Sequence, residues 1–311
     1  MDIDPKTFLE NNQPRENTKC GFVAMIGAPN AGKSTLTNAL VGQHVSIVSS
    51  KVQTTRFPVK GIFIEGDSQI VLVDTPGVFK TNKEGLNRAM VQSALQSVSD
   101  ADLILFVVDV AHANKSLDNA IPEIPELTGK NVCLVLNKVD KIDKQVLLEL
   151  TQKINEKYEF KETFMISALK RQGLERLIER LAEGMPKGPF LFPEDQISDL
   201  PLKLYTAERT REAAFERLNK EVPYGLMVET EKVEEGKTKL VIEQVIYIKE
   251  ERHKPIILGQ KGKTIKDIGI AARKAIEEEL EQEVHLSLFV KVKKGWDHSS
   301  QILNSWGLLT D

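Results

Sequence analysis

The stretch Gly27-Ala-Pro-Asn-Ala-Gly-Lys-Ser-Thr35 decides the fold of this chain. An apolar run at 21–26 precedes it, and apolar residues at helical spacing follow it at 36–41. This order predicts a strand, a glycine-rich loop and a helix, which is the setting in which Gly-x-x-x-x-Gly-Lys-Ser forms a phosphate-binding P-loop. An ordinary glycine loop before a helix is the alternative.

The chemistry of this loop explains why a nucleotide is the expected ligand. Glycines let backbone N–H groups turn inward, and the helix N-terminus presents its positive dipole end to the same anion. Lys33 can reach the β- and γ-phosphates, and the Ser34 hydroxyl can bind Mg²⁺. The predicted nucleotide-binding residues of the loop are Gly27, Ala28, Pro29, Asn30, Ala31, Gly32, Lys33, Ser34 and Thr35.

The composition limits the class of protein. A length of 311 residues predicts two domains. A net charge of −3, with 28% charged and 41% hydrophobic residues, is typical of soluble globular proteins and does not decide for or against nucleic acid. Cys20 and Cys133 lie in or beside apolar runs, which indicates buried thiols in a reducing compartment. Because the sequence has neither a bilayer-length apolar stretch nor a secretory signal pattern, we expect a cytosolic protein.

Strand and helix patterns alternate through the first half. Short, continuously apolar runs suit parallel strands that helices cover on both faces. We therefore expect a doubly wound α/β sheet whose ligands bind at the carboxyl ends of the strands. The further expected strands are 60–65, 69–74, 103–108, 132–136 and 163–166, and the further expected helices are 86–98, 144–158 and 173–183.

Polar motifs follow three of these strands. In Asp74-Thr-Pro-Gly77, Asp74 can hold a magnesium-bound water and the Gly77 N–H can meet a γ-phosphate, although the tetrapeptide alone is a common turn. In Asn137-Lys-Val-Asp140, the carboxylate can accept two N–H donors that guanine has and adenine lacks. A charged loop is the alternative for an isolated match. The predicted nucleotide-binding residues here are Asp74, Thr75, Pro76, Gly77, Asn137, Lys138, Asp140, Ser167, Ala168 and Leu169.

Together these motifs look like the five sequence boxes of the Ras-like GTPases related to translation factors. The resemblance covers 20–185 and implies hydrolysis of GTP with Mg²⁺. Thr55, directly before Arg56, matches the magnesium threonine of that family, and Thr54 is the less favoured match. By this resemblance the catalytic residues are Lys33, Thr55 and Gly77, and the metal ligands are Ser34, Thr55 and Asp74.

Two positions bear on the rate of hydrolysis. Ras-like enzymes have a water-orienting glutamine where this chain has Val78. We therefore expect slow intrinsic hydrolysis, at or below the ~10⁻⁴–10⁻² s⁻¹ of unassisted GTPases. In potassium-activated relatives an asparagine at the position of Asn30 holds a monovalent cation. Binding of K⁺ and simple shaping of the loop both remain open for Asn30.

A second pattern follows a connection rich in proline and glycine at 184–193. A three-stranded sheet backed by helices is expected, which is a mixed α+β domain. The expected elements are a helix at 210–221, strands at 226–232 and 239–248 around a turn at 234–237, a stretch at 256–262 that starts as a short apolar helical turn and ends in a glycine loop, a helix at 263–281 and a strand at 284–292.

Gly259-Gln-Lys-Gly262 lies between the helical turn and the long helix, and it resembles the Gly-x-x-Gly loop of a type-II KH domain. Such a loop clamps about four nucleotides of RNA backbone. A helix–turn–helix corner with solvated lysines is the alternative. Trp296 fits either stacking on a base or packing in the core. The expected RNA-binding residues are Ile257, Gly259, Gln260, Lys261, Gly262, Lys263, Lys266 and Arg273.

A Ras-like GTPase domain followed by a KH domain is similar to the Era family of bacterial ribosome-assembly GTPases. Two stretches of this chain resemble signatures of that family: Gln53-Thr-Thr-Arg56 and Lys291-Val-Lys-Lys-Gly-Trp296. The resemblance implies binding of GTP, GDP and Mg²⁺, and of 16S ribosomal RNA near its 3′ end during maturation of the small (30S) subunit. It also implies a cytoplasmic monomer that contacts the inner face of the cell membrane peripherally.

Two other functions stay open. The C-terminal module of a GTPase can dock to a protein or to a membrane surface, and a P-loop can serve an ATPase or kinase, against which Asp140 argues. The predicted boundaries are a flexible lead-in at 1–19, a GTPase domain at 20–185, a linker at 186–202, a KH RNA-binding domain at 203–298 and a C-terminal tail at 299–311.

Overall fold

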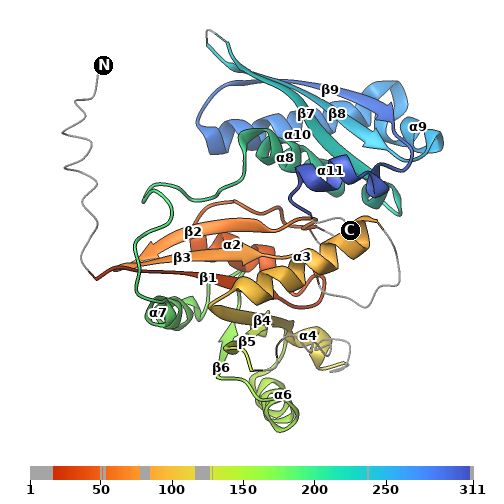
Figure 1. Cartoon of the computed structure of the whole chain (residues 1–311). Helices are drawn as coiled ribbons and strands as arrows, with labels where there is room; N and C mark the ends of the chain where they lie inside the picture. Colours follow the sequence, from red (N-terminus) through yellow and green to blue (C-terminus); the bar gives the residue numbers. More distant parts are fainter. Residues whose placement is uncertain are drawn as a thin grey trace, which may run out of the picture. The chain divides into compact units, whose positions relative to one another are not determined.

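The computed structural model describes residues 17–49, 51, 54–77, 85–115, 127, 129–236 and 238–308. These residues form two compact units (Figure 1). The first unit takes the described residues of Met1–Val45, Lys60–Asp74 and Leu95–Ser198. The second takes those of Ser46–Val59, Thr75–Ala94 and Asp199–Asp311. Two segments from the first half of the sequence thus group with the C-terminal residues.

The first unit contains a six-stranded sheet. Parallel pairs join β1 to β3 and β4, β4 to β5, and β5 to β6, so the expected doubly wound α/β fold is confirmed. Every predicted strand of this half ends within two residues of its observed bounds. In spatial order the strands are β2 (Val59–Glu65), β3 (Ser68–Asp74), β1 (Lys19–Ile26), β4 (Leu103–Asp109), β5 (Val132–Asn137) and β6 (Glu162–Ile166).

Helices cover both faces of this sheet. Consecutive residues of β4 point to opposite faces, and Leu105, Phe106 and Val107 are all at most 1% exposed. Leu36 and Leu177, from two different helices, join the core on one face. The helices are α2 (Lys33–Val41), α3 (Leu86–Asp100), whose first turns belong to the second unit, α4 (Val110–Ala113), α6 (Lys144–Lys157) and α7 (Leu174–Gly184), with the short helix η2 (Val139–Lys141).

The connection that was expected to be a linker packs along the first unit. The buried side chain of Gln69 donates to the carbonyl of Phe192 at 2.7 Å and accepts the N–H groups of Leu191 and Phe192. Further along, the N–H of Ile62 donates to the carbonyl of Ile197. Residues 186–198 are therefore held by hydrogen bonds to strands of the sheet.

The second unit contains the three-stranded sheet β7-β8-β9, with β7 and β8 antiparallel and β8 and β9 parallel. Helices α8 and α10 pack together and against this sheet, around a core that includes Ala214, Ile246 and Ile268. The elements are α8 (Leu202–Arg217), η3 (Val222–Gly225), β7 (Leu226–Glu235), β8 (Leu240–Ile248), η4 (Glu251–His253), α9 (Lys254–Leu258), η5 (Gln260–Gly262), α10 (Lys263–Leu280), β9 (Val284–Val292), η6 (Trp296–His298) and α11 (Ser300–Ser305).

Two elements of the second unit differ from expectation. Helix α8 begins at Leu202, well before the predicted 210. The sequence pattern missed its first turns because the buried face of the helix is largely polar or small and gives no apolar stripe. On that face Thr210 donates to the buried amide of Gln244 at 2.6 Å. The predicted tail contains helix α11, whose Ile302 and Leu303 are buried. The predicted turn at 234–237 includes Lys237, which lies outside the described residues.

Within the described part of the chain, no helix is both long enough and apolar enough to span a bilayer.

Candidate functional site

The predicted P-loop has a backbone that requires its glycines. Gly27 has φ 146°, and a Cβ there would lie 2.1 Å from the carbonyl oxygen of Val107. Gly32 has φ 96°, and a Cβ there would lie 2.3 Å from Nδ2 of Asn137. Both positions therefore require glycine for two reasons: the backbone has a positive φ, and neighbouring atoms lie where a Cβ would be. The loop ends where α2 begins, so the free N–H groups of that helix face the same space.

The lysine of the loop lies against its own backbone. The Nζ of Lys33 donates to the carbonyls of Gly27 at 3.1 Å and Ala28 at 3.2 Å. Burial lowers the pKa of Lys33 to about 8, against the opposing effect of the Asp74 carboxylate. A buried cation bound only to neutral carbonyls is costly, so phosphate oxygens are better partners for it.

The donors expected for Mg²⁺ lie partly in this unit. Ser34 is in the first turn of α2, and the fully buried Asp74 ends β3 beside Met25 in the sheet register. A hydroxyl and a carboxylate are the hard oxygen donors that Mg²⁺ takes, so these residues fit the ion. The other predicted residues of this region, Thr55, Thr75, Pro76 and Gly77, belong to the second unit, and Val78 lies outside the described residues.

One side chain ties the predicted guanine loops to the P-loop. The Nδ2 of Asn137 donates to the carbonyl of Ala31 at 2.9 Å. Its Oδ1 accepts the N–H groups of Lys138 at 2.8 Å and Ala168 at 3.0 Å. The structure thus brings together the Asn-Lys-Val-Asp and Ser-Ala-Leu motifs, as a shared site requires.

Asp140 is prepared to accept hydrogen bonds. Its side chain is 8% exposed, Ser167 donates to its Oδ1 at 2.7 Å, and Lys170 lies 3.6 Å from its Oδ2. The Ser167 hydrogen bond, more than the Lys170 charge, holds the pKa of the Asp140 carboxyl below its ordinary value. The carboxylate therefore stays ionised. Leu169 is 76% exposed, so its side chain has no packing role here.

Sequence reasoning missed Asp109. This residue ends β4, and its Oδ2 binds the Nζ of Lys138 at 2.8 Å, while the same Nζ donates to the carbonyl of Asn30 at 2.6 Å. Lys138 is also held at a positive φ of 66°. The only sequence signal for Asp109 is its place directly after an apolar run, where strand carboxyl ends meet.

The Gly-x-x-Gly loop of the second unit is exposed and basic. Gly259 has φ 70°, and a Cβ there would lie 2.1 Å from Oγ1 of Thr264, whereas a Cβ on Gly262 at φ 77° would meet nothing within 4 Å. The loop runs into the N-terminus of α10, which favours anions. The exposed cations at this end form no ion pair with any described residue; they are Lys261, Lys263 and Lys266.

One predicted RNA contact needs correction. Ile257 is 0% exposed in the core under α10, so its side chain is not available to a base, whereas the neighbouring Ile256 is 49% exposed. Arg273 stays a predicted RNA contact; it pairs with Glu277 at 3.0 Å and lies about 16 Å along the helix from Gly262 at 1.5 Å per residue. Trp296 is 1% exposed and packs in the core, donating its Nε1 to Gly225.

The fold and these sites define a class of protein: a P-loop GTPase domain carried with a KH domain. Family models agree, because residues 22–138 match the family described as 50S ribosome-binding GTPase and residues 221–297 match the KH domain. GTPase Era of Brucella suis biovar 1 (strain 1330) is 54% identical over 293 residues, which is 94% of either chain. GTPase Era of Rhizobium meliloti (strain 1021) is 51% identical over 292 residues, which is 94% of this chain and 93% of that one.

Two solved structures are similar over the same length. One is a crystal structure of an Aquifex aeolicus Era variant bound to GDP·AlF₄⁻, and the other is Era in complex with MgGDPNP and nucleotides 1506–1542 of 16S ribosomal RNA. Each is 39% identical, has a TM-score of 0.86, and covers 94% of this chain and 100% of its own. The chain belongs to the Era family of GTPases. The GTPase and KH predictions are therefore confirmed.

Proposed function

We propose that this chain hydrolyses GTP as a molecular switch, binds 16S ribosomal RNA near its 3′ end, and acts in maturation of the small (30S) ribosomal subunit. The observation that carries the proposal is the Asn137 tie, which holds the P-loop and the guanine-selecting Asp140 in one site. The exposed Gly259–Gly262 loop supplies the RNA surface. The related Era structure with a 16S fragment supports this choice of RNA.

The residues of the chain divide the work of hydrolysis. Lys33 and the P-loop N–H groups stabilise the negative charge that develops on the γ-phosphate as water attacks. Ser34, Thr55 and Asp74 would hold Mg²⁺, which when bound neutralises charge on the β- and γ-phosphate oxygens. Asp140 selects guanine over adenine because adenine would leave its carboxylate unpaired. Since a valine side chain can neither donate nor accept a hydrogen bond, the Val78 side chain cannot take the place of a water-orienting glutamine, and we expect a slow intrinsic rate.

The switch is proposed to link nucleotide state to RNA binding. Thr55 and Gly77 hold their segments on the γ-phosphate and Mg²⁺ in the GTP state and release them after hydrolysis. Both residues belong to the unit that carries the Gly-x-x-Gly loop. A different RNA affinity with GDP and with a GTP analogue is the expected consequence.

A K⁺ ligand, the domain boundaries and the cellular location are also proposed, by similarity to the family. Asn30, exposed and at φ 62°, is the candidate ligand for K⁺ beside the phosphates. Hydrolysis that is equally fast in KCl and in NaCl would limit Asn30 to shaping the loop. Residues 20–185 are proposed as the GTPase domain and 203–298 as the RNA-binding domain of a cytoplasmic monomer, with peripheral contact to the cell membrane.

Crosslinking of the intact protein to total cellular RNA tests the proposal. It is done with GDP and with a non-hydrolysable GTP analogue, and the crosslinked sites are sequenced. A peak at the 3′ end of small-subunit RNA that is stronger with the analogue is expected. Diffuse crosslinks that are the same with both nucleotides would not affect the GTPase assignment. They would favour the alternative in which the C-terminal module docks to a protein or a membrane.

A further inference from the structure

The residues on either side of Thr55 are both held by the C-terminal part of the second unit. The carbonyl of Thr54 accepts a hydrogen bond from Nη2 of Arg211 on α8. Arg211 is itself fixed, because its side chain is 2% exposed and pairs with Glu208 one turn earlier at 2.5 Å. On the other side of Thr55, the guanidinium of Arg56 is buried.

Arg56 lies in a cage of carbonyl oxygens. It donates to the carbonyl of Leu226 at 2.6 Å and to that of Tyr224 at 3.2 Å, at the end of η3 where helix carbonyls are otherwise unsatisfied. Its guanidinium stacks 5.2 Å from the ring of Trp296, which in turn donates to Gly225. Among the described residues no carboxylate forms an ion pair with Arg56, and burial lowers its pKa to about 9. The position of this side chain is therefore set by backbone groups that have little freedom to move.

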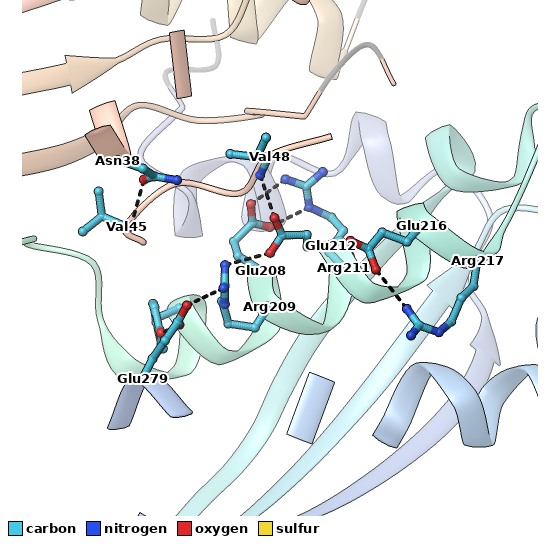
Figure 2. A network of polar contacts seen from close by, with 11 residues as sticks. Asn38, Val45, Val48, Glu208, Arg209, Arg211, Glu212, Glu216, Arg217 and Glu279 are labelled. Carbon is cyan, nitrogen blue, oxygen red and sulfur yellow. Dashed lines mark hydrogen bonds and ion pairs between the residues drawn. The ribbon is translucent and has the colours of Figure 1, made fainter. Parts of the chain in front are cut away.

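Further anchors lie upstream in the same segment. The N–H of Val48 donates to Glu212 of α8 at 2.7 Å, and the Nζ of Lys51 donates to the carbonyl of Phe215 (Figure 2 shows the Val48 contact). The described residues from Val48 to Arg56 are thus tied to α8, η3 and β7. An arginine that donates to a main-chain carbonyl fixes the path of the chain and not just one side chain.

We infer that Arg211 and Arg56 are positioning residues for Thr55, so that the unit carrying the KH fold sets the rate of GTP hydrolysis. The inference rests on the proposed role of Thr55 as a Mg²⁺ ligand. Fixing both neighbours of a residue removes most of its backbone freedom. The conformational entropy lost when Thr55 is ordered in the GTP state is then smaller, so less binding energy is needed to order it. The contribution is specific to GTP, because GDP does not require the threonine.

Substitution of Arg211 in the full-length protein tests this. Arg211→Met is expected to lower kcat for GTP about tenfold, since small misplacements of catalytic groups have effects of this size or larger. It should also lower the affinity for a non-hydrolysable GTP analogue, while the affinity for GDP stays at the wild-type value. Arg211→Lys keeps a charged donor for the Thr54 carbonyl and should recover part of the rate. Arg217→Met is the matched control, because Arg217 lies on the same helix but contacts Glu216 and the carbonyl of Ala213.

The outcomes separate the inference from the proposed function. Thr55→Ala should lower kcat, and adding Arg211→Met to it should have little further effect, because both act through one group. If Arg211→Met behaves like Arg217→Met while Thr55→Ala loses activity, the positioning role is wrong. An equal loss of GDP and analogue affinity in Arg211→Met would also overturn it, since that result indicates a general structural defect. If Thr55→Ala itself hydrolyses GTP normally, the proposed role of Thr55 fails.

Discussion

The side chain of Asn137 hydrogen-bonds to Ala31 of the P-loop, with 2.9 Å between its Nδ2 and the carbonyl oxygen. The same side chain accepts the N–H groups of Lys138 and Ala168, so one buried amide fixes the mutual positions of the phosphate loop and both guanine loops. The packing is close, because a Cβ on Gly32 would lie 2.3 Å from Nδ2 of Asn137. Guanine selectivity and phosphate binding therefore share a single support.

Replacing this support should weaken nucleotide binding, because Asn137 also holds the loops that carry the other expected nucleotide contacts. Asn137→Ala removes three hydrogen bonds and leaves buried backbone groups unpaired. At about 1 kcal/mol for each bond, GDP affinity should fall roughly 100-fold. Titration with fluorescent GDP measures the change, and Asn155→Ala on the exposed face of α6 is the control. An Asn137→Ala protein with wild-type affinity would show that the loops are held by other contacts.

The Ser167–Asp140 hydrogen bond predicts a pH effect. Ser167 donates to the charged form of Asp140, so the pKa of the carboxyl is depressed in the folded protein. The stabilisation is present above the pKa of the unfolded chain and is lost as pH falls through the depressed folded pKa. Ser167→Ala should raise the pKa of Asp140 toward its ordinary value. Loss of guanine nucleotide binding on acidification should then begin at a higher pH than in the wild type.

Dissociation constants for GDP across the acid range, compared with those at neutral pH, measure this shift. Near neutral pH the Asp140 carboxyl is ionised in both proteins, so the two affinities should differ little there. Superimposable acid profiles would contradict the assigned role of the Ser167 hydroxyl.

Burial of Lys33 predicts proton uptake when nucleotide binds. Burial lowers its pKa to about 8 although the Asp74 carboxylate acts in the opposite direction, and phosphate oxygens would raise that pKa again. Near pH 9 most of the Lys33 side chains are neutral, so GDP binding should take up most of a proton, whereas near pH 6.5 it should take up almost none. Calorimetry in two buffers of different ionisation enthalpy measures the uptake. Uptake close to zero near pH 9 would mean that Lys33 is already charged.

The motifs could be found from sequence because each is a short, local pattern at the end of a strand or helix. Strand bounds followed from apolar runs, and the order of the motifs placed Asp74, Asn137 and Ser167 at one edge of the sheet. Contacts that depend on distant partners gave no such signal. The Asp109–Lys138 pair and the buried polar face of α8 are of this kind. Ile257 shows another limit, because apolar residues at helical spacing look the same in a groove floor and in a core.

The Gly262 position allows a sharp test of RNA binding. Its φ of 77° and ψ of 14° suit asparagine and aspartate better than other side chains, and a Cβ there meets nothing within 4 Å. Gly262→Asp adds a negative charge where RNA phosphates are expected, whereas Gly262→Asn adds the same shape without charge. RNA affinity should fall about tenfold or more for the aspartate variant and much less for the asparagine variant.

Gly259 is a poorer choice for this comparison, because a Cβ there would clash with Thr264 and disturb the loop itself. Filter binding with a 16S 3′-end fragment gives the affinities, and unchanged GTP hydrolysis without RNA shows that both variants are folded. Equal RNA affinity in the two variants would show that this loop does not contact the RNA phosphates.

Helix α10, which follows the Gly-x-x-Gly loop, is joined by polar contacts to the segment that carries Thr55. Figure 2 shows a chain of polar contacts in which the N–H of Val48 binds Glu212, Glu212 pairs with Arg209, and Arg209 pairs with Glu279 of α10 at 2.5 Å. Arg209 is 5% exposed, so these contacts are shielded from solvent. Glu279→Gln should weaken the last pair and reduce the ratio of RNA affinities between the GTP-analogue and GDP states about threefold, within the usual ~0.5–2 kcal/mol for such coupling residues.

Glu278→Gln is the control, because Glu278 is the adjacent residue on α10 and pairs with Lys274 on the surface. RNA affinities are measured for both variants with each nucleotide, so that the coupling appears as a ratio and not as a general loss of binding. If the ratio in Glu279→Gln equals that in Glu278→Gln, the contacts through Arg209 hold α8 and α10 together without transmitting nucleotide state. Coupling would then have to pass through the segment that carries Thr55 and Arg56 alone.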